Sequence, residues 1–219
     1  MSERIVLCED ALVWLEGHEA LAGSSLVASM PDISEFGHLS LPEWKDWFIR
    51  TASLILSRCP DDGVTIFYQS DIKVEGEWVD KGYLCQKAAE ALGFKLLWHK
   101  IICRAPAGTI TMGRPAYSHI LCFSKSLKAD MSKSSADVIP DMGDKAWERG
   151  MGLTACLMIA KFIKEQTPSS LVINPFCGHG SMLAAANAFE LKAVGIERSP
   201  KRAESANKLT VAKDLKSFL

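Results

Sequence analysis

The chain has 219 residues, of which 48% are hydrophobic and 23% charged, a composition typical of one globular domain with a sizeable core. Its 25 basic and 26 acidic side chains give a net charge of -1, which excludes a protein that coats nucleic acid through bulk charge. Seven cysteines without C-x-x-C spacing indicate neither a disulfide framework nor a metal site, so no metal is expected.

The chain lacks recognisable targeting or membrane-spanning segments. Its first residues, MSERIVLCED, do not combine a basic region with an apolar run, as a signal peptide does. No apolar run approaches the ~20 residues that cross a bilayer. We therefore expect a protein without membrane association in a reducing compartment, the cytoplasm, with a nuclear location left open.

Apolar, β-branched runs alternate with amphipathic segments, and this alternation favours an α/β, doubly wound, mostly parallel sheet. The connector between the two middle strands has two Pro and two Gly and no helical pattern, so these strands should pair antiparallel. In chain order we expect a strand at 4–8, a strand at 25–29, a helix at 40–58, a strand at 64–69, a helix at 81–92, strands at 95–103 and 117–124, a polar linker or mobile loop at 125–146, a helix at 147–165, a strand at 171–174, a helix at 181–189, a strand at 192–197 and a helix at 200–215.

The most informative segment is a strand that runs into a glycine turn and then a helix, at 171–181. Gly178 and Gly180 allow a sharp bend and a close approach of the backbone to a ligand, and the helix that follows presents free N–H groups. Glu197 ends the next strand, where a carboxylate accepts hydrogen bonds from ribose hydroxyls. The alternative is a tight strand–helix turn with a surface glutamate.

These residues resemble the cofactor-binding block of S-adenosylmethionine (SAM)-dependent DNA amino-methyltransferases, which reads D-P-F-x-G-x-G-T, then A-A, then G-I-E. Asn174 and Ser181 replace the usual Asp and Thr. The resemblance implies that 174–181 holds the amino-acid end of SAM and Glu197 its ribose. The matching residues are Asn174, Pro175, Phe176, Cys177, Gly178, His179, Gly180 and Ser181, then Ala184, Ala185 and Ala186, then Val194, Gly195, Ile196 and Glu197.

The N-terminal part carries the rest of the resemblance. Residues 4–15 resemble the family's strand–G-D-A-L-x-W-L segment, which implies that Asp10 lies near the adenine. Before the helix at 153, the segment with Gly150 and Met151 stands where the family folds over the methionine end of SAM. The glycines there would allow a close approach to the cofactor.

Ser29-Met30-Pro31-Asp32 resembles the catalytic tetrapeptide (D/N/S)-P-P-(Y/F/W) of that family. There the first side chain and a backbone carbonyl accept hydrogen bonds from the target amino group, and the aromatic stacks on the flipped base. Ser29 can accept and Pro31 stiffens the loop, but Met30 replaces a proline and Asp32 the aromatic. Asp32 would act as a general base, bind a donor on the substrate or only cap a turn, and these alternatives stay open.

The catalytic motif precedes the glycine turn, an order found in one subset of the family. The resemblance therefore implies a circularly permuted, seven-stranded Rossmann-like sheet with one antiparallel strand. It divides a single domain into a catalytic-motif half at 1–124, the linker at 125–146 and a SAM-binding half at 147–219. In such a sheet the helix at 200–215 should end close to the first strand.

A second polar cluster follows the strand at 64–69, at a carboxyl end. It would line the substrate pocket, with Trp78 as the stacking surface that position 32 lacks, or it is a solvated loop with one packed Trp. Its members are Gln69, Ser70, Asp71, Lys73, Trp78, Asp80 and Lys81. Trp44, Trp47 and Phe48 have helical spacing and are expected in the core.

The sequence thus predicts a SAM-dependent methyltransferase that acts on nucleic acid. RNA such as tRNA is preferred over DNA, because no insertion is long enough for the target-recognition domain that DNA enzymes usually carry. The alternatives are a DNA amino-methyltransferase, a methyltransferase of small molecules or proteins, and a non-catalytic scaffold subunit with the same fold. A homodimer or a partner subunit is compatible with a minimal fold of this kind.

Overall fold

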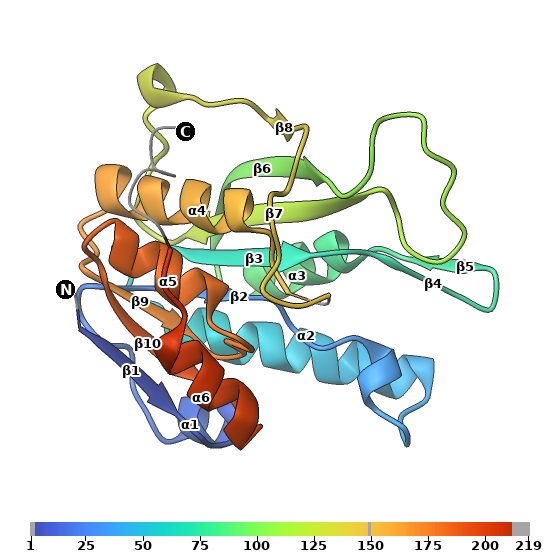
Figure 1. The fold of residues 1–219 in the computed structure, drawn as a ribbon, viewed down its shortest axis with the longest axis horizontal. Coiled ribbons are helices and arrows are strands. Elements are labelled where there is room, and N and C mark those ends of the chain that lie inside the picture. Colours follow the sequence, from blue (N-terminus) through green and yellow to red (C-terminus); the bar gives the residue numbers. More distant parts are fainter. Residues whose placement is uncertain (1–2, 149, 212–219) are drawn as a thin grey trace.

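The computed structural model describes residues 3–148 and 150–211, and its centre is an eight-stranded sheet (Figure 1). Along the sheet the strand order is β1-β10-β9-β2-β3-β7-β6-β8, and β7 runs antiparallel to both neighbours. The strands are β1 (Arg4–Leu7), β2 (Ser24–Ala28), β3 (Thr65–Gln69), β6 (Lys95–Cys103), β7 (Tyr117–Ser124), β8 (Val138–Ile139), β9 (Leu171–Asn174) and β10 (Lys192–Ile196).

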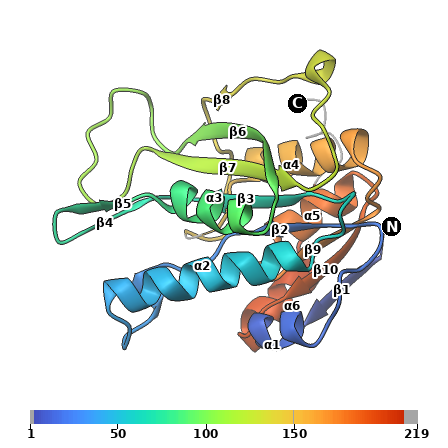
Figure 2. The ribbon, with the colours of Figure 1, turned by 180° about the vertical axis from the view of Figure 1, so that it is seen from behind.

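Helices cover both faces of the sheet, as Figures 1 and 2 show from opposite sides. One core lies between the sheet and α1, α2 and α3, and the other between the sheet and α4, α5 and α6. The mostly parallel sheet and its helices confirm the predicted fold class, although the sheet has eight strands rather than the seven expected, because β8 adds one at the edge. The helices are α1 (Ala11–Glu16), α2 (Leu41–Ser57), α3 (Lys81–Ala91), α4 (Leu153–Gln166), α5 (Ser181–Ala188) and α6 (Pro200–Lys208), with short 3-10 turns at Ile33–Glu35 and Met131–Lys133.

Three short elements escaped the sequence pattern because each is too short to show a period. Helix α1 has six residues and is capped by Asp10. The hairpin of β4 (Ile72–Val74) and β5 (Glu77–Val79) turns at Glu75 and Gly76, whose positive φ angles of 51° and 85° suit a two-residue turn. Strand β8 extends the sheet from within the segment 125–146, which is therefore more than a linker.

The helix expected at 147–165 begins only at Leu153. Gly152 comes so close to the preceding loop that a Cβ there would lie 2.0 Å from the Met142 carbonyl oxygen. The backbone around Gly152 is thus used for a close crossing rather than for a first helical turn. In α2, Trp44 and Phe48 are fully buried as expected, whereas Trp47 is only partly buried.

The C-terminal helix lies against the first strand, as the motif order requires. Strand β1 pairs with β10, and the Arg4 guanidinium donates to the carbonyl oxygens of Ala206 (2.8 Å) and Leu209 (2.6 Å). The predicted proximity is therefore confirmed, although 212–215 of the expected helix lie outside the described residues; the circular permutation itself stays a prediction. In the described part of the chain no helix has both the length and the apolar character to cross a membrane.

Candidate active site

A cleft of about 860 Å³ lies at the carboxyl ends of the parallel strands. This volume is within the usual range for a small-molecule or cofactor site. The cleft is lined by most of the residues that the sequence singled out, from both halves of the chain: Asp10, Ser29, Pro31, Asp32, Lys81, Gly150, Met151, Asn174, Pro175, Phe176, Cys177, Gly178, His179, Ser181 and Glu197. The glycine turn and the tetrapeptide therefore face one shared space.

The two glycines of the turn have different tasks. Gly178 has a φ of 54° and lines the cleft. Gly180 has a φ of 87°, and a Cβ there would lie only 2.7 Å from Ala206 Cα, so it serves the packing of α6 and does not line the cleft. Helix α5 starts directly afterwards at Ser181, and Ser181 and Met182 of its first turn line the cleft.

Glu197 is fixed at the tip of β10 by backbone donors. Its Oε2 accepts from the Gly178 N–H (3.2 Å), and its Oε1 accepts from the Ser199 N–H (2.8 Å). Arg202 approaches the same carboxylate at 3.6 Å. A carboxylate offers about four lone-pair sites, so acceptor capacity is left for two hydroxyl groups. Asp10 also lines the cleft, while its Oδ1 caps α1 through the Leu12 N–H (2.8 Å).

Trp147 covers the glycine turn. Its ring centroid lies 5.5 Å from that of His179, and the Arg202 guanidinium lies 5.3 Å from the ring centre on Trp147. Gly150 permits this packing, because a Cβ at Gly150 would come within 2.7 Å of the Trp147 ring. Gly150, which the sequence predicts to approach the cofactor, thus makes room for the Trp147 ring.

The Asp32 carboxylate is 5% exposed and ion-paired on both oxygens. Oδ1 pairs with Lys81 Nζ, and Oδ2 pairs with the Arg114 guanidinium. Burial lowers the pKa of Lys81, and the charge of Asp32 offsets part of that shift. Asp32 also opens the 3-10 turn, where its N–H donates to Glu35 Oε1 (3.2 Å). With both oxygens held by cations, the carboxylate is organised as a charge partner rather than as a free base.

Of the second polar cluster, Gln69, Ser70 and Lys81 line the cleft. Asp71 lies behind it, where Oδ1 accepts from the Lys81 N–H (2.8 Å) and Oδ2 from His119 Nε2 (3.0 Å) and Trp78 Nε1 (3.1 Å). Burial alone would raise the pKa of Asp71, but these hydrogen bonds lower it. Trp78 and Asp80 line a separate shallow hollow, so the structure does not bring Trp78 to the cleft as a stacking surface.

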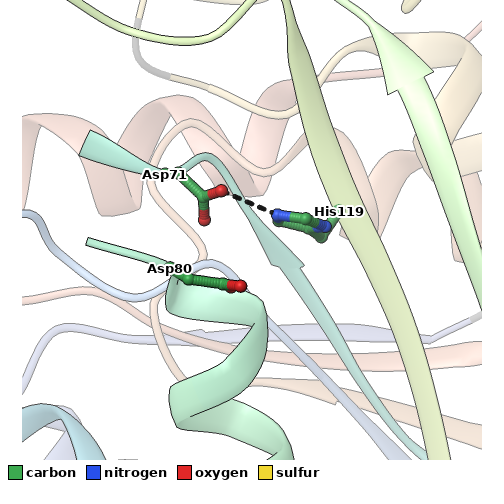
Figure 3. Close-up of side chains that lie close together, drawn as sticks. All are labelled: Asp71, Asp80 and His119. Atoms are coloured by element: carbon green, nitrogen blue, oxygen red, sulfur yellow. Dashed lines mark hydrogen bonds and ion pairs between the residues drawn. The ribbon is translucent and has the colours of Figure 1, made fainter. Parts of the chain in front are cut away.

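Asp71, Asp80 and His119 place one potential ligand atom each within 4.8 Å of one another (Figure 3). Each already has a hydrogen-bond role, since Asp71 and His119 bond to each other and Asp80 caps α3 through the Tyr83 N–H (2.8 Å). His119 also contacts His99, with 2.9 Å between Nδ1 and Nε2. The group therefore forms a hydrogen-bonded network that supports the backbone at Lys81.

The lining residues that the sequence did not anticipate include two aromatic rings and three cations. Phe36 and Trp47 contact each other, with ring centroids 4.5 Å apart, and both line the cleft near Pro31. Trp47 has the helical spacing of a core residue, and nothing in the sequence marks it as exposed to a cleft. The cations Arg104, Arg114 and Lys145 lie in loops far apart in the chain, and no motif connects them to Ser29–Asp32.

The mixed sheet, with a glycine turn after β9 and an acidic residue after β10, is an α/β fold that the chain shares with solved structures of DNA methyltransferases. The Putative DNA Modification Methylase of Thermus thermophilus, complexed with S-adenosyl-L-methionine, is 19% identical over 93% of this chain and 91% of that chain, with a TM-score of 0.68. The cytosine-N4-specific PvuII DNA methyltransferase is 16% identical over 100% of this chain and 91% of its own, with a TM-score of 0.69.

A third similar structure is the M1.HpyAVI–SAM complex, 16% identical over 94% of this chain and 98% of that chain, with a TM-score of 0.63. No family model and no curated protein sequence matches the chain. At these identities the likeness shows the fold, and the chain has the fold of the DNA amino-methyltransferases.

Proposed function

We propose that this protein is a SAM-dependent methyltransferase that acts on DNA. The observation that carries the proposal is the shared cleft, which the glycine turn and Glu197 line together with Ser29–Asp32. The glycine turn and Glu197, after β9 and β10, would form the cofactor end, and Ser29–Asp32, after the neighbouring strand β2, the substrate end. Two of the similar structures are named as complexes with SAM, and the two named for a substrate are DNA enzymes. SAM supplies a methyl group on a sulfonium, so transfer needs mainly an aligned nucleophile.

The residues present suit SAM along its length. Asn174 to Ser181 would hold the amino-acid end, where helix α5 presents its N–H groups to a carboxylate. Glu197 would bind the ribose hydroxyls and Asp10 lie on the adenine side. Gly150 and Met151 would close over the methionine end, with Trp147 beside them.

DNA replaces RNA as the preferred substrate. The preference for RNA rested on the missing target-recognition domain. The match to the PvuII enzyme covers 91% of that DNA methyltransferase chain, so the length of this chain is no argument against a DNA substrate. Loops that border the cleft would contribute to the choice of DNA sequence.

Ser29 is the residue best placed to orient a target amino group. Its hydroxyl can accept a hydrogen bond from that group, as can the Met30 carbonyl, and this would direct the nitrogen lone pair at the methyl. Asp32 cannot stack on a base, but Phe36 and Trp47 provide aromatic surface in the same part of the cleft. The aromatic function of the family's tetrapeptide would thus have moved from position 32 to these rings.

The proposal is tested by transfer of a radiolabelled methyl group from SAM to duplex DNA and, in parallel, to bulk tRNA. We expect label in DNA, with the methylated nucleoside identified as an amino-methylated base after digestion. Ser29→Ala should lower the rate at least tenfold while binding of S-adenosylhomocysteine (SAH) is kept. Label in tRNA alone would favour the RNA alternative. SAH binding without transfer to either would favour the scaffold.

A further inference from the structure

We propose that Arg104, Arg114 and Lys145 form an anion site at the substrate end of the cleft that binds a backbone phosphate of DNA. The inference rests on the proposed function and names a contact by which the protein would hold its substrate. Nothing in the family resemblance or in the tetrapeptide points to these three residues. They are brought together only by the fold.

The three cations lie on three separate segments of the chain. Arg104 directly follows β6, Arg114 lies near the end of the long loop that returns to β7, and Lys145 lies between β8 and α4 (Figure 1). All three line the same cleft as Ser29 and Asp32. Their positions are fixed by backbone contacts, since the Arg104 N–H donates to the Ala116 carbonyl (2.7 Å) and Lys145 forms a bridge with Gly152.

The site carries more positive than negative charge. Asp32 is one carboxylate shared by Arg114 and the buried Lys81. Arg104 has no carboxylate within ion-pair distance among the described residues, and its guanidinium donates only to the Pro115 carbonyl (3.4 Å). Lys145 donates to the Glu148 carbonyl oxygen (3.2 Å) rather than to a carboxylate. An anion entering the cleft would supply the missing counter-charge.

The charges of these residues also lower the pKa values of Arg104 and Lys145. Burial lowers the pKa of Arg104, and the charge of Arg114 lowers it further. Burial likewise lowers the pKa of Lys145, with Arg104 as the next contributor in the same direction. Cations that repel one another in a partly buried cleft are stabilised when an anion binds between them.

The donors of these three side chains suit a phosphate group. Two guanidinium groups present planar pairs of N–H donors, which match phosphate oxygens, and the ammonium adds a point charge. Asp32 holds the Arg114 guanidinium from one side and leaves its other donors for a ligand, which makes Asp32 a positioning residue. With a net charge of -1 over the whole chain, affinity for a polyanion must come from a local patch of this kind.

The test compares two charge-matched double variants in binding to fluorescein-labelled duplex DNA, with SAH present and KCl varied. Arg104→Gln/Lys145→Gln removes two cations from the cleft. Lys95→Gln/Lys164→Gln removes two exposed cations elsewhere, on β6 and α4. At about 0.1 M salt we expect the cleft variant to bind at least tenfold more weakly than the control, and its log K against log salt slope to fall by about 1–2.

Calorimetry with SAH distinguishes the possible failures. If the cleft variant binds DNA as the control does, the phosphate site is wrong. If it loses SAH affinity and keeps DNA affinity, the cations serve the carboxylate of the cofactor, and the proposal is overturned. A folded wild-type protein that binds DNA but not SAH would defeat the proposed methyltransferase function and leave the anion site standing. If the double variant fails to fold, Arg104→Gln and Lys145→Gln are each compared with Lys95→Gln and Lys164→Gln in the same assay.

Discussion

The two ends of the cleft are built in different ways. The central part of the end expected to hold the cofactor comes from one continuous β–α–β stretch, β9–α5–β10, in which the Gly178 N–H donates to the Glu197 carboxylate. The opposite end is assembled from segments far apart in the chain, with Asp32 joined to Lys81 and Arg114. The first end is a local motif on a turn, and the second is a tertiary charge cluster. Substitutions should therefore act differently at the two ends.

The largest effect on stability is expected at the assembled end. Lys81→Met would leave the buried Asp32 with Arg114 alone, whose side chain is 36% exposed. Removing one partner of a buried ion pair leaves a poorly compensated charge, and we expect a loss of about 3 kcal/mol in the free energy of unfolding. Urea unfolding followed by circular dichroism measures it. Arg114→Gln is the control and should cost about 1 kcal/mol or less. Equal losses in the two variants would contradict this account of the cluster.

Substitutions in the glycine turn should cause a smaller loss of stability, and the loss should differ between Gly178 and Gly180. Gly180→Ala combines a left-handed backbone with a Cβ 2.7 Å from Ala206 Cα, so α6 must shift, at a cost of about 2 kcal/mol. Gly178→Ala meets only Trp147, at 3.5 Å, so the cost is the backbone strain alone, about 1 kcal/mol. Thermal unfolding of both variants provides the comparison. The division of tasks would be wrong if Gly178→Ala proved the more destabilising.

Behind the substrate end, Asp71→Asn should cost about 1–2 kcal/mol at pH 7, since the carboxylate accepts three hydrogen bonds. The folded-state pKa of Asp71 is lowered, so this stability is present above the unfolded pKa of about 3.9 and is lost as pH falls through the lower folded value. The difference between the wild type and the variant should thus shrink below about pH 4. A difference that stays constant down to pH 3 would show that the charge of Asp71 is not the cause.

The smallest effect concerns His99. Burial and the neighbouring His119 lower the pKa of His99, so the unfolded chain, with a pKa of about 6.5, binds the proton more strongly. Stability should therefore decrease as pH falls below about 6.5. His99→Gln removes this contribution, and its melting temperature should decline less between pH 7.5 and 5.5 than that of the wild type. Parallel curves for the two proteins would argue against it.

The same contrast explains what the sequence could predict. The glycine turn, Glu197 and Ser29–Asp32 are short motifs at the ends of strands, and a strand end at the carboxyl edge places its residues in the cleft whatever the rest of the chain does. Asp32 forms its ion pairs because the fold brings two side chains next to it. They are Arg114, in the loop before β7, and Lys81, at the start of α3. No local pattern encodes that contact, so the general-base interpretation of Asp32 could not be weighed against its ion-paired state.

Aromatic residues illustrate the same limit. Trp78 lies in β5 and is 49% exposed, yet its indole N–H donates to Asp71 and its side chain lines a hollow separate from the cleft. Trp47 has the spacing of a core residue but reaches the cleft because it lies on the face of α2 beside Phe36. Helical period determines which face a residue occupies, while the neighbouring loops determine whether that face is covered.

The central claim, that the local end of the cleft binds SAM, is tested most directly by calorimetric titration of the wild type and of Glu197→Gln with SAH. The account predicts one site per chain in the wild type, and affinity at least about tenfold weaker in the variant, which loses charge-assisted hydrogen bonds to the ribose. Absence of binding by folded wild-type protein, or equal affinity of both proteins, would contradict it.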